Sequence, residues 1–353
     1  MSGIDRKKIL QDLESLVRAR GPCGQEDEVR DHCRARLHEL CDHVSVDDVG
    51  NLIGVVRGKT AEPGIRVLTH MDENCLYVKR IDANGRLQVR PIGGIRYWRV
   101  GDGPVDVMDD RGRVIPGILG LGPRHTVEHS PVKMANNGTA PDWEMACVET
   151  RMSKEQLLGR GIHPGSRVVI AQGRRSLVAF EDCVAGYFMD DRAAIAVMLA
   201  AGEEIKRSGP PVCDIHLICT TMEENGGAAA HTLAALPGLI SLAVEVIPAA
   251  REYDIPLDDV PVIVIRDSLV LYTRSVYLCL KAAAEQAGTG YRFAALDRIG
   301  SDAGLCFKAG SAAQVGLMGF PTDNTHGFEV CLPEGLANCA ELLAAYLRAG
   351  GNP

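Results

Sequence analysis

The stretch Ile218-Cys-Thr-Thr-Met-Glu-Glu-Asn-Gly-Gly227 constrains the fold more than any other part of the sequence. An apolar run from Val212 to Cys219 predicts a buried strand, and the adjacent carboxylates Glu223 and Glu224 follow it. Parallel α/β sheets carry their chemistry at such strand ends. Adjacent side chains of a regular strand point to opposite faces, so both glutamates can serve one site only if the chain turns there. Asn-Gly-Gly permits that turn, but a solvated acidic turn is the alternative.

Chain length and charge narrow the possible partners. With 353 residues, 46% of them hydrophobic, the chain can form two domains with a sizeable core. The net charge is −8, and no basic run is interleaved with aromatic residues. These properties argue against a nucleic-acid or anionic membrane surface, so we expect peptides or small molecules as partners.

The sequence also indicates a cellular location. Charged residues interrupt the apolar residues of the first sixteen positions, so we expect no signal peptide. Apolar runs such as 193–202 are shorter than the ~20 residues of a membrane helix. The twelve cysteines include no Cys-x-x-Cys pair and are expected to be reduced core residues. We therefore expect a cytoplasmic protein.

Helices and strands alternate in the two outer parts of the chain. Apolar residues at three- and four-residue spacing predict helices over 4–20 and 25–41. Further predicted helices cover 192–206, 227–236, 272–287 and 334–349. The predicted strands are 44–48, 51–57, 64–69, 212–219, 239–246, 260–265, 291–295 and 312–318. This order indicates an α/β fold, with a mixed, mostly parallel sheet sandwiched by helices.

The middle of the chain has a different character. From about residue 74 to 182, short alternating segments are separated by Gly and Pro turns, and only 153–158 is clearly helical. This pattern is typical of a small β-barrel or sandwich. We predict a β-rich domain over 74–182, inserted into an α/β domain formed by 1–73 and 183–353.

Five candidate metal ligands lie at the exits of predicted strands or of the segment that leads back from the insertion: His70, Asp190, Glu224, Glu245 and His326. Strand ends of a parallel sheet meet at one edge, so these residues can converge. Two imidazoles and three carboxylates suit two divalent ions, with zinc or cobalt first and manganese as a further option. One carboxylate has to lie between the ions, because two cations ~3.5–4 Å apart repel each other.

Simpler interpretations exist for several of these residues. His70 alone could be a loop histidine, and Asp190 with Asp191 could cap the helix that begins near Arg192. Ser301-Asp302 is interpreted as a helix start rather than as a catalytic pair. Glu245 is harder to explain in this way, because a carboxylate in an apolar strand is costly to bury unless it is paired or binds metal.

Taken together, the motifs resemble the di-metal tetrahedral aminopeptidase family, which includes glutamyl aminopeptidases and some members historically labelled as cellulases. The family has the zinc-aminopeptidase fold. The likeness covers nearly the whole chain, with the β-rich insertion in the expected place. It rests on His-Met-Asp-Glu at 70–73, Asp-Asp-Arg at 190–192, Glu-Glu at 223–224, Ser-Asp-Ala-Gly at 301–304 and His326, in this order and spacing.

The resemblance implies a role for each candidate ligand. His70 and Glu245 would bind one ion, His326 and Glu224 would bind the other, and Asp190 would bridge the two. In this family we expect Asp where this chain has Glu245, whose longer side chain could change the spacing or the preference of the ions.

The resemblance also implies an activity, a metal-dependent aminopeptidase that removes N-terminal residues from peptides. Asp72 would orient the His70 imidazole, and Glu223 would be the general base that passes a proton to the leaving amine. Family members form homo-oligomers, commonly dodecamers built from dimers through the inserted domain.

Departures from the family near the pocket leave two other functions open. Asn74-Cys75 replaces a small apolar residue and glycine, and His326 is followed by Gly-Phe-Glu329 instead of Ser-Pro-Val-Glu. One alternative is a di-metal amidohydrolase that deacylates N-acyl amino acids or peptides. The other is a non-catalytic, metal-stabilised binding or scaffold protein, although a structural metal site has no use for the base Glu223.

Overall fold

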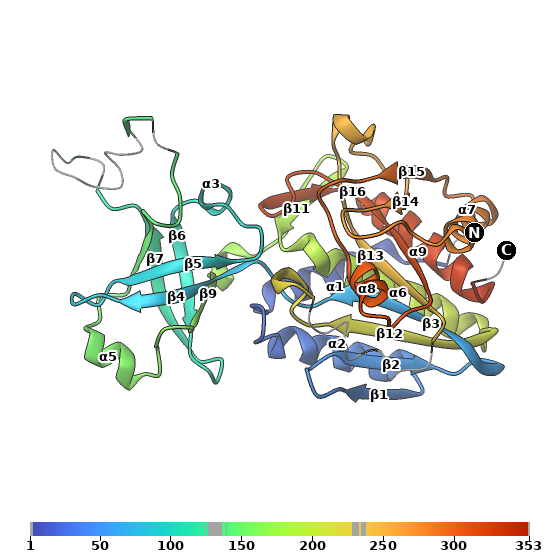
Figure 1. Cartoon of the computed structure of the whole chain (residues 1–353), viewed down its shortest axis with the longest axis horizontal. Helices are drawn as coiled ribbons and strands as arrows, with labels where there is room; N and C mark the ends of the chain where they lie inside the picture. The colour runs from blue at the N-terminus through green and yellow to red at the C-terminus, as the bar shows by residue number, and fades with distance from the viewer. Residues whose placement is uncertain are drawn as a thin grey trace.

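The protein consists of a small barrel beside a larger α/β unit (Figure 1). This computed structural model describes residues 3–123, 125, 136–138, 140–227, 233 and 238–351. The predicted helix over 227–236 lies almost wholly outside these residues. All twelve cysteines are free thiols, as expected. Within the described residues, no helix combines the length and the apolar character needed to cross a membrane.

An eight-stranded sheet forms the centre of the α/β unit, in the order β1-β2-β12-β3-β13-β16-β14-β15. The pairs β12–β3, β3–β13, β13–β16 and β14–β15 are parallel, whereas β1–β2, β2–β12 and β16–β14 are antiparallel. The predicted mixed, mostly parallel sheet is therefore confirmed. The strands are β1 (His43–Val46), β2 (Leu52–Val56), β3 (Thr60–His70), β12 (Cys213–Thr220), β13 (Ile240–Pro248), β14 (Val262–Arg266), β15 (Arg292–Ala295) and β16 (Gln314–Thr322).

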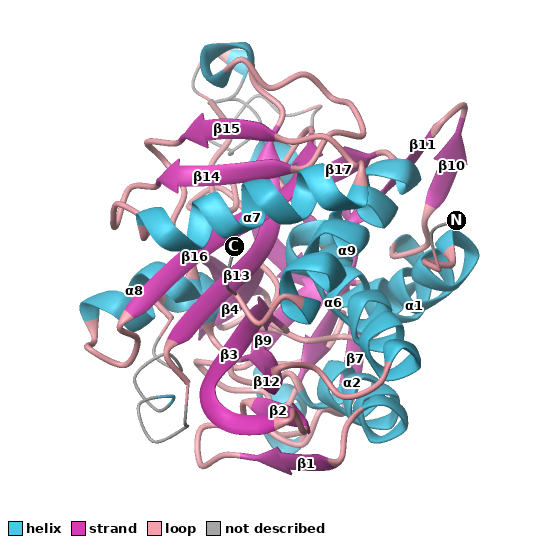
Figure 2. Ribbon diagram, turned by 90° about the vertical axis from the view of Figure 1, so that its right-hand side faces the viewer, coloured by secondary structure: helices cyan, strands magenta, loops and turns pink. Residues whose placement is uncertain are grey.

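Helices cover both faces of this sheet. Side chains alternate along β3, so Val67 packs with the larger helices while its neighbour Leu68 packs in a separate core with residues of α8. Figure 2 shows the larger helices together in front of the sheet. The helices are α1 (Arg6–Arg18), α2 (Asp27–Leu40), α6 (Met189–Ser208), α7 (Arg274–Ala287), α8 (Asp302–Lys308) and α9 (Pro333–Arg348).

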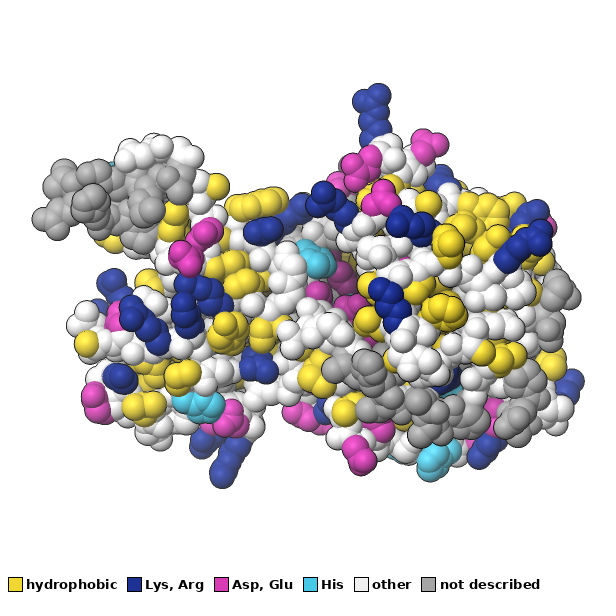
Figure 3. Space-filling model, in the orientation of Figure 1, with side chains coloured by type: hydrophobic (Ala, Val, Ile, Leu, Met, Phe, Trp, Pro, Cys, Tyr) yellow, Lys and Arg dark blue, Asp and Glu magenta, His cyan; other side chains and the backbone are white. Residues whose placement is uncertain are grey.

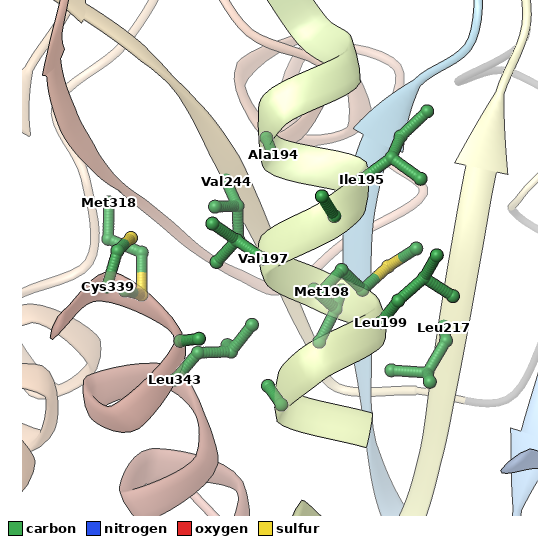
Figure 4. Close-up of a cluster of buried hydrophobic side chains, with 14 of the residues drawn as sticks. Ala194, Ile195, Val197, Met198, Leu199, Leu217, Val244, Met318, Cys339 and Leu343 are labelled. Carbon is green, nitrogen blue, oxygen red and sulfur yellow. The ribbon is translucent and has the colours of Figure 1, made fainter. Parts of the chain in front are cut away.

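Helix α6 fixes the position of the site because it is almost entirely enclosed. Its residues 193–199 are all buried, and Figure 4 shows them among side chains of β12, β13, β16 and α9. Fully burying one such aliphatic side chain contributes about 1.5–3 kcal/mol relative to its exposure. The start of α6, which carries Asp190, is therefore held firmly against the sheet.

The predicted barrel is present in the insertion. Six antiparallel strands close in the order β4-β5-β8-β7-β6-β9 around their own apolar core. The predicted helical piece corresponds to α5 (Lys154–Gly159), whose start has a capping box formed by Ser153 and Gln156. The barrel also carries the short helix α3 (Tyr97–Val100). The strands are β4 (Cys75–Ile81), β5 (Leu87–Ile92), β6 (Gly103–Met108), β7 (Val114–Gly120), β8 (Cys147–Glu149) and β9 (Arg167–Ile170).

A small third sheet connects the barrel to the α/β unit. It consists of β10 (Val178–Phe180), β11 (Cys183–Tyr187) and β17 (Phe328–Cys331), all antiparallel. The boundary predicted after residue 182 falls in the turn between β10 and β11. Three 3-10 turns also lie among the described residues: η1 (Gln172–Arg174), η2 (Glu223–Asn225) and η4 (Arg251–Tyr253).

Candidate metal centre

The five predicted ligands come together where the parallel strands end. His70 is the last residue of β3, Glu224 lies in η2 just after β12, and His326 lies between β16 and β17. Asp190 is at the start of α6. Glu245 lies inside a strand near its C-terminal end, as expected, although β13 continues to Pro248 rather than ending at residue 246. It still reaches the site because its side chain points to the same cavity as the other four ligands.

His70, Asp190 and Glu245 form one set of possible ligands, called the first triad here. His70 Nε2 lies 2.9 Å from Asp190 Oδ1 and 4.0 Å from Glu245 Oε2. Asp191 belongs to the same group, in which one donor atom of each residue lies within 4.8 Å of the others. The first triad is enclosed, with His70 only 2% exposed.

Asp190, Glu224 and His326 form the second triad. His326 Nε2 lies 3.3 Å from Asp190 Oδ2 and 3.9 Å from Glu224 Oε1. Asp190 therefore directs one carboxylate oxygen to each histidine. A carboxylate that joins two neighbouring cation sites needs this arrangement.

Carboxylates are concentrated in this site, and burial and neighbouring charges shift their pKa values. Burial raises the pKa of Glu224 to about 8, with a further contribution from the Asp190 carboxylate. The pKa of Glu245 is also raised well above its usual range, by burial and then by Asp191. Burial alone would raise the pKa of Asp190, but hydrogen bonds with His326 and His70 lower it. Imidazole and carboxylate donors crowded in this way fit divalent ions, which would neutralise the carboxylates.

Asp72 supports both triads. Its two oxygens accept hydrogen bonds from the backbone N–H groups of Glu223, at 2.9 Å, and of Glu224, at 3.0 Å. His70 Nδ1 lies 3.4 Å from Asp72 Oδ1 and 3.1 Å from the Asp72 carbonyl oxygen. These contacts leave His70 Nε2 facing the first triad. One buried carboxylate thus orients an imidazole and also shapes the turn that carries the two glutamates.

The turn after β12 allows the adjacent side chains of Glu223 and Glu224 to point into one site. It begins earlier than Asn225, because Met222 already has a left-handed conformation with φ 57° and the two glutamates lie in the 3-10 turn η2. Gly226 continues the turn with φ +95°. Both carboxylates therefore line the same cavity of about 200 Å³. The alternative of a solvated acidic turn does not hold, since Glu223 and Glu224 are both within this cavity.

Glu223 is placed differently from the five candidate ligands. It lines the cavity but belongs to neither triad. Burial raises its pKa well above the usual range, and the nearby carboxylates of Asp302 and Glu224 add to this effect. A general base works best when its pKa lies near the operating pH. Figure 3 shows acidic side chains and a histidine in a hollow of this face, near the barrel.

Glu329 is a supporting residue that the sequence analysis did not identify. This buried carboxylate accepts hydrogen bonds from the backbone N–H groups of Asp190, at 3.0 Å, and of His326, at 2.8 Å. It therefore ties the shared ligand to the loop of the second triad. The spacing His326-Gly-Phe-Glu329 was the available signal, but the hydrogen bonds are to backbone groups, which a sequence does not display.

Of the two helix starts considered near the site, capping by Asp191 is wrong and the start at Ser301 is confirmed. Asp191 does not cap α6: that helix has no side-chain cap, and Asp191 Oδ2 accepts the backbone N–H of His70 at 3.2 Å. Ser301 does begin α8, as predicted, with its hydroxyl accepting the N–H of Gly304 at 3.3 Å. Asp302 additionally accepts a hydrogen bond from Thr220, directly before the glutamate turn.

A fully buried ion cluster holds the two ligand motifs together. Glu73, the last residue of His-Met-Asp-Glu, contacts Arg175 and also Arg192, whose Nη2 lies 3.0 Å from Glu73 Oε2. Arg192 is the last residue of Asp-Asp-Arg. Removing one partner of such a cluster leaves an uncompensated buried charge, so the cluster ties the segment after His70 to the start of α6.

Comparison with known proteins identifies the family of this chain. The sequence profile of the M42 glutamyl aminopeptidase family matches residues 50–342. A putative aminopeptidase of Acetivibrio thermocellus is 25% identical over 346 residues, which cover 96% of this chain and 97% of the relative.

Solved structures of aminopeptidases share the fold of this chain. An aminopeptidase of the archaeon Desulfurococcus kamchatkensis has a TM-score of 0.86 at 25% identity, covering 97% of this chain and 95% of its own. The TET1 peptidase of Pyrococcus horikoshii, described as assembling into a tetrahedron or a large octahedral shell, shares the fold. Its TM-score is 0.84 at 21% identity, with 96% of this chain and 99% of its own covered.

Proposed function

Since the chain belongs to the M42 glutamyl aminopeptidase family, it is a metal-dependent aminopeptidase, and we propose that its reaction uses two divalent ions per chain with Glu223 as the general base. One observation carries this proposal: two triads share Asp190, and a further carboxylate that belongs to neither lines the same cavity. The family assignment favours this function over the deacylase and the non-catalytic scaffold that the sequence left open.

The proposed ligand roles follow the two triads. His70 and Glu245 would hold one ion, His326 and Glu224 would hold the other, and Asp190 would bridge them. We propose zinc or cobalt, because imidazole and carboxylate donors suit these ions, with manganese as a further option. When bound, such ions lower the pKa of water toward ~7 and polarise the scissile carbonyl.

The protein's own residues position the reactants and move the proton. Glu223 accepts a proton from the attacking water and delivers it to the nitrogen of the leaving peptide. Asp72 keeps Glu223 in place through the backbone N–H that it accepts.

We also propose that the protein acts as a homo-oligomer built from dimers, with a dodecamer as one possible form. The support is the fold shared with a peptidase described as forming closed shells. In this proposal the β-rich segment 74–182 mediates dimerisation, and the α/β segments 1–73 and 183–353 carry catalysis. A cytoplasmic location stays a prediction from the sequence.

Metal analysis combined with activity tests this function. The purified protein should contain two divalent ions per chain, and a chelator should abolish cleavage of aminoacyl substrates until zinc or cobalt is added back. The substrate panel should include N-acyl amino acids and peptides as well. Cleavage of the N-acylated compounds alone would overturn the proposed reaction, and activity that survives complete removal of metal would overturn the two-ion centre.

A further inference from the structure

The barrel contributes a side chain to the second triad. Asn74, the residue just before β4, donates from Nδ2 to Glu224 Oε1. Asn74 is 6% exposed, so this contact is shielded from water. Glu224 Oε1 is also the oxygen that faces His326 Nε2, at 3.9 Å. A carboxylate oxygen has two lone pairs, so it can accept from Asn74 and still face an ion.

The opposite strand end fixes the position of Asn74. Strands β4 and β5 pair through Cys75 and Ile92, so Asn74 and Gly93 stand next to each other just beyond this pair. Gly93 has φ +84°, and a Cβ at this position would lie 2.0 Å from Asn74 Oδ1 and 3.0 Å from Glu224 Oε2. The close approach of the barrel backbone therefore requires a residue without a side chain.

Gly94, which follows Gly93 after the end of β5, also lies close to the histidine of the second triad. A Cβ on Gly94 would lie 2.8 Å from His326 Nδ1. The open end of the β4–β5 hairpin, where β4 begins and β5 ends, thus lies against both Glu224 and His326. The first triad differs, because the hydrogen bonds and ion pairs described for His70 and Glu245 involve no residue of the barrel.

The NH₂ group of the Asn74 amide faces Glu224, where Nδ2 donates to Glu224 Oε1. Asn74 Oδ1 is then buried without a hydrogen-bond partner among the described residues. An unpaired buried acceptor destabilises the fold, so packing alone gives no reason for an amide at this position. The contact with Glu224 supplies the reason.

We propose that Asn74 is a positioning residue of the second triad, which holds the Glu224 carboxylate in place and so sets how tightly this triad binds its ion. The inference rests on the proposed two-ion centre. Partners that orient metal ligands typically contribute ~10–100-fold to metal affinity. The effect should be confined to one of the two ions, because Asn74 contacts one triad only.

Cobalt titration of the full-length, metal-stripped protein tests the inference. Asn74→Leu keeps the approximate shape of the side chain and removes the amide. It should weaken one of the two Co²⁺ binding phases by ~10–100-fold and leave the other unchanged. Asn84→Leu is the matched control, since Asn84 is exposed in the turn of the same hairpin, and both of its phases should equal those of the wild type.

Two further variants guard against an effect of misfolding. Asn74→Ala should cause the same selective loss and decides the question if the leucine variant unfolds without metal. Gly94→Ala, which pushes against His326, should weaken the same phase. Thermal unfolding of the metal-free variants checks that they fold.

Two kinds of failure are distinguishable. Two unchanged phases in both Asn74 variants, or two phases weakened equally, would overturn the role of Asn74 while the two-ion centre stands. A wild-type protein that binds fewer than two Co²⁺ ions would overturn the centre itself, and this inference with it.

Discussion

The two triads of the site share Asp190 but are built in different ways. His70 ends a buried strand and is 2% exposed, and Glu245 lies inside β13. His326 is 33% exposed at its side chain and lies in a loop, and Glu224 lies in a short turn. Loops on a rigid scaffold open more readily than strands in a core. The first triad is therefore the more rigid of the two, and the second is the more accessible to solvent.

The two triads are also held in place by different parts of the molecule. The first triad is held by the sheet and by the buried cluster of Glu73 and Arg192. The second depends on the backbone contacts of Glu329 and on the barrel residue Asn74. Among the described contacts, those of Asn74, Gly93 and Gly94 at the ends of β4 and β5 reach Glu224 and His326, so changes at these three positions should alter the second triad and spare the first.

The largest expected effect is a loss of turnover without a loss of metal binding at either triad. Glu223→Gln removes the proposed base without removing a ligand, so the turnover rate should fall by ~10²–10⁴-fold. Steady-state kinetics with an aminoacyl substrate measure the turnover rate, and cobalt titration measures metal binding. Unchanged turnover would reject Glu223 as the base, and lost cobalt binding would reassign it as a ligand.

A change at Asp72 should affect the two triads together. Asp72→Ala removes the acceptor of two backbone N–H groups and a contact of His70. Both Co²⁺ phases should weaken by ~10–100-fold, in contrast to the single phase expected for Asn74→Leu. Weakening of one phase alone would show that Asp72 supports only that triad.

Acidification should weaken the second triad's hold on its ion. Burial alone lowers the pKa of His326, but its hydrogen bond with Asp190 and the charge of Glu224 raise it to about 10 without metal. At pH 7 an ion must therefore displace a proton from this imidazole. Affinity should rise from pH 6 to 9, by about tenfold per pH unit for each proton displaced. Cobalt titrations across this range check the sign, and affinity that falls with rising pH would contradict it.

The smallest effect concerns the wall of the cavity, away from both triads. Arg298 is exposed and supplies a positive charge among the lining residues. Arg298→Ala should raise the KM for substrates with an acidic first residue by a few-fold at most, because an exposed ion pair contributes only about 0.2–1 kcal/mol. Substrates with N-terminal leucine serve as the comparison and should be unaffected. Equal changes for both substrates would exclude a charge-based role for Arg298.

Much of this protein was readable in its sequence. The apolar run before Glu223, the alternation of helices and strands, and the change of pattern near residue 74 predicted the sheet and the inserted barrel. Residue type at successive strand ends also identified His70, Asp190 and His326 as candidates that the structure brings together. These properties are local or periodic, so a linear sequence carries them.

Other features were decided only by the tertiary structure. Glu329 ties the backbone N–H of the nearby His326 to that of Asp190, which is far away in the chain, and Asp191 accepts the backbone N–H of His70 instead of capping its own helix. Asn74 faces Glu224 because two barrel strands end beside the glutamate turn. Side-chain identity determined which residues can bind a cation. Which groups hold those residues in place depended on how distant backbone segments pack, and residue type and spacing do not encode that directly.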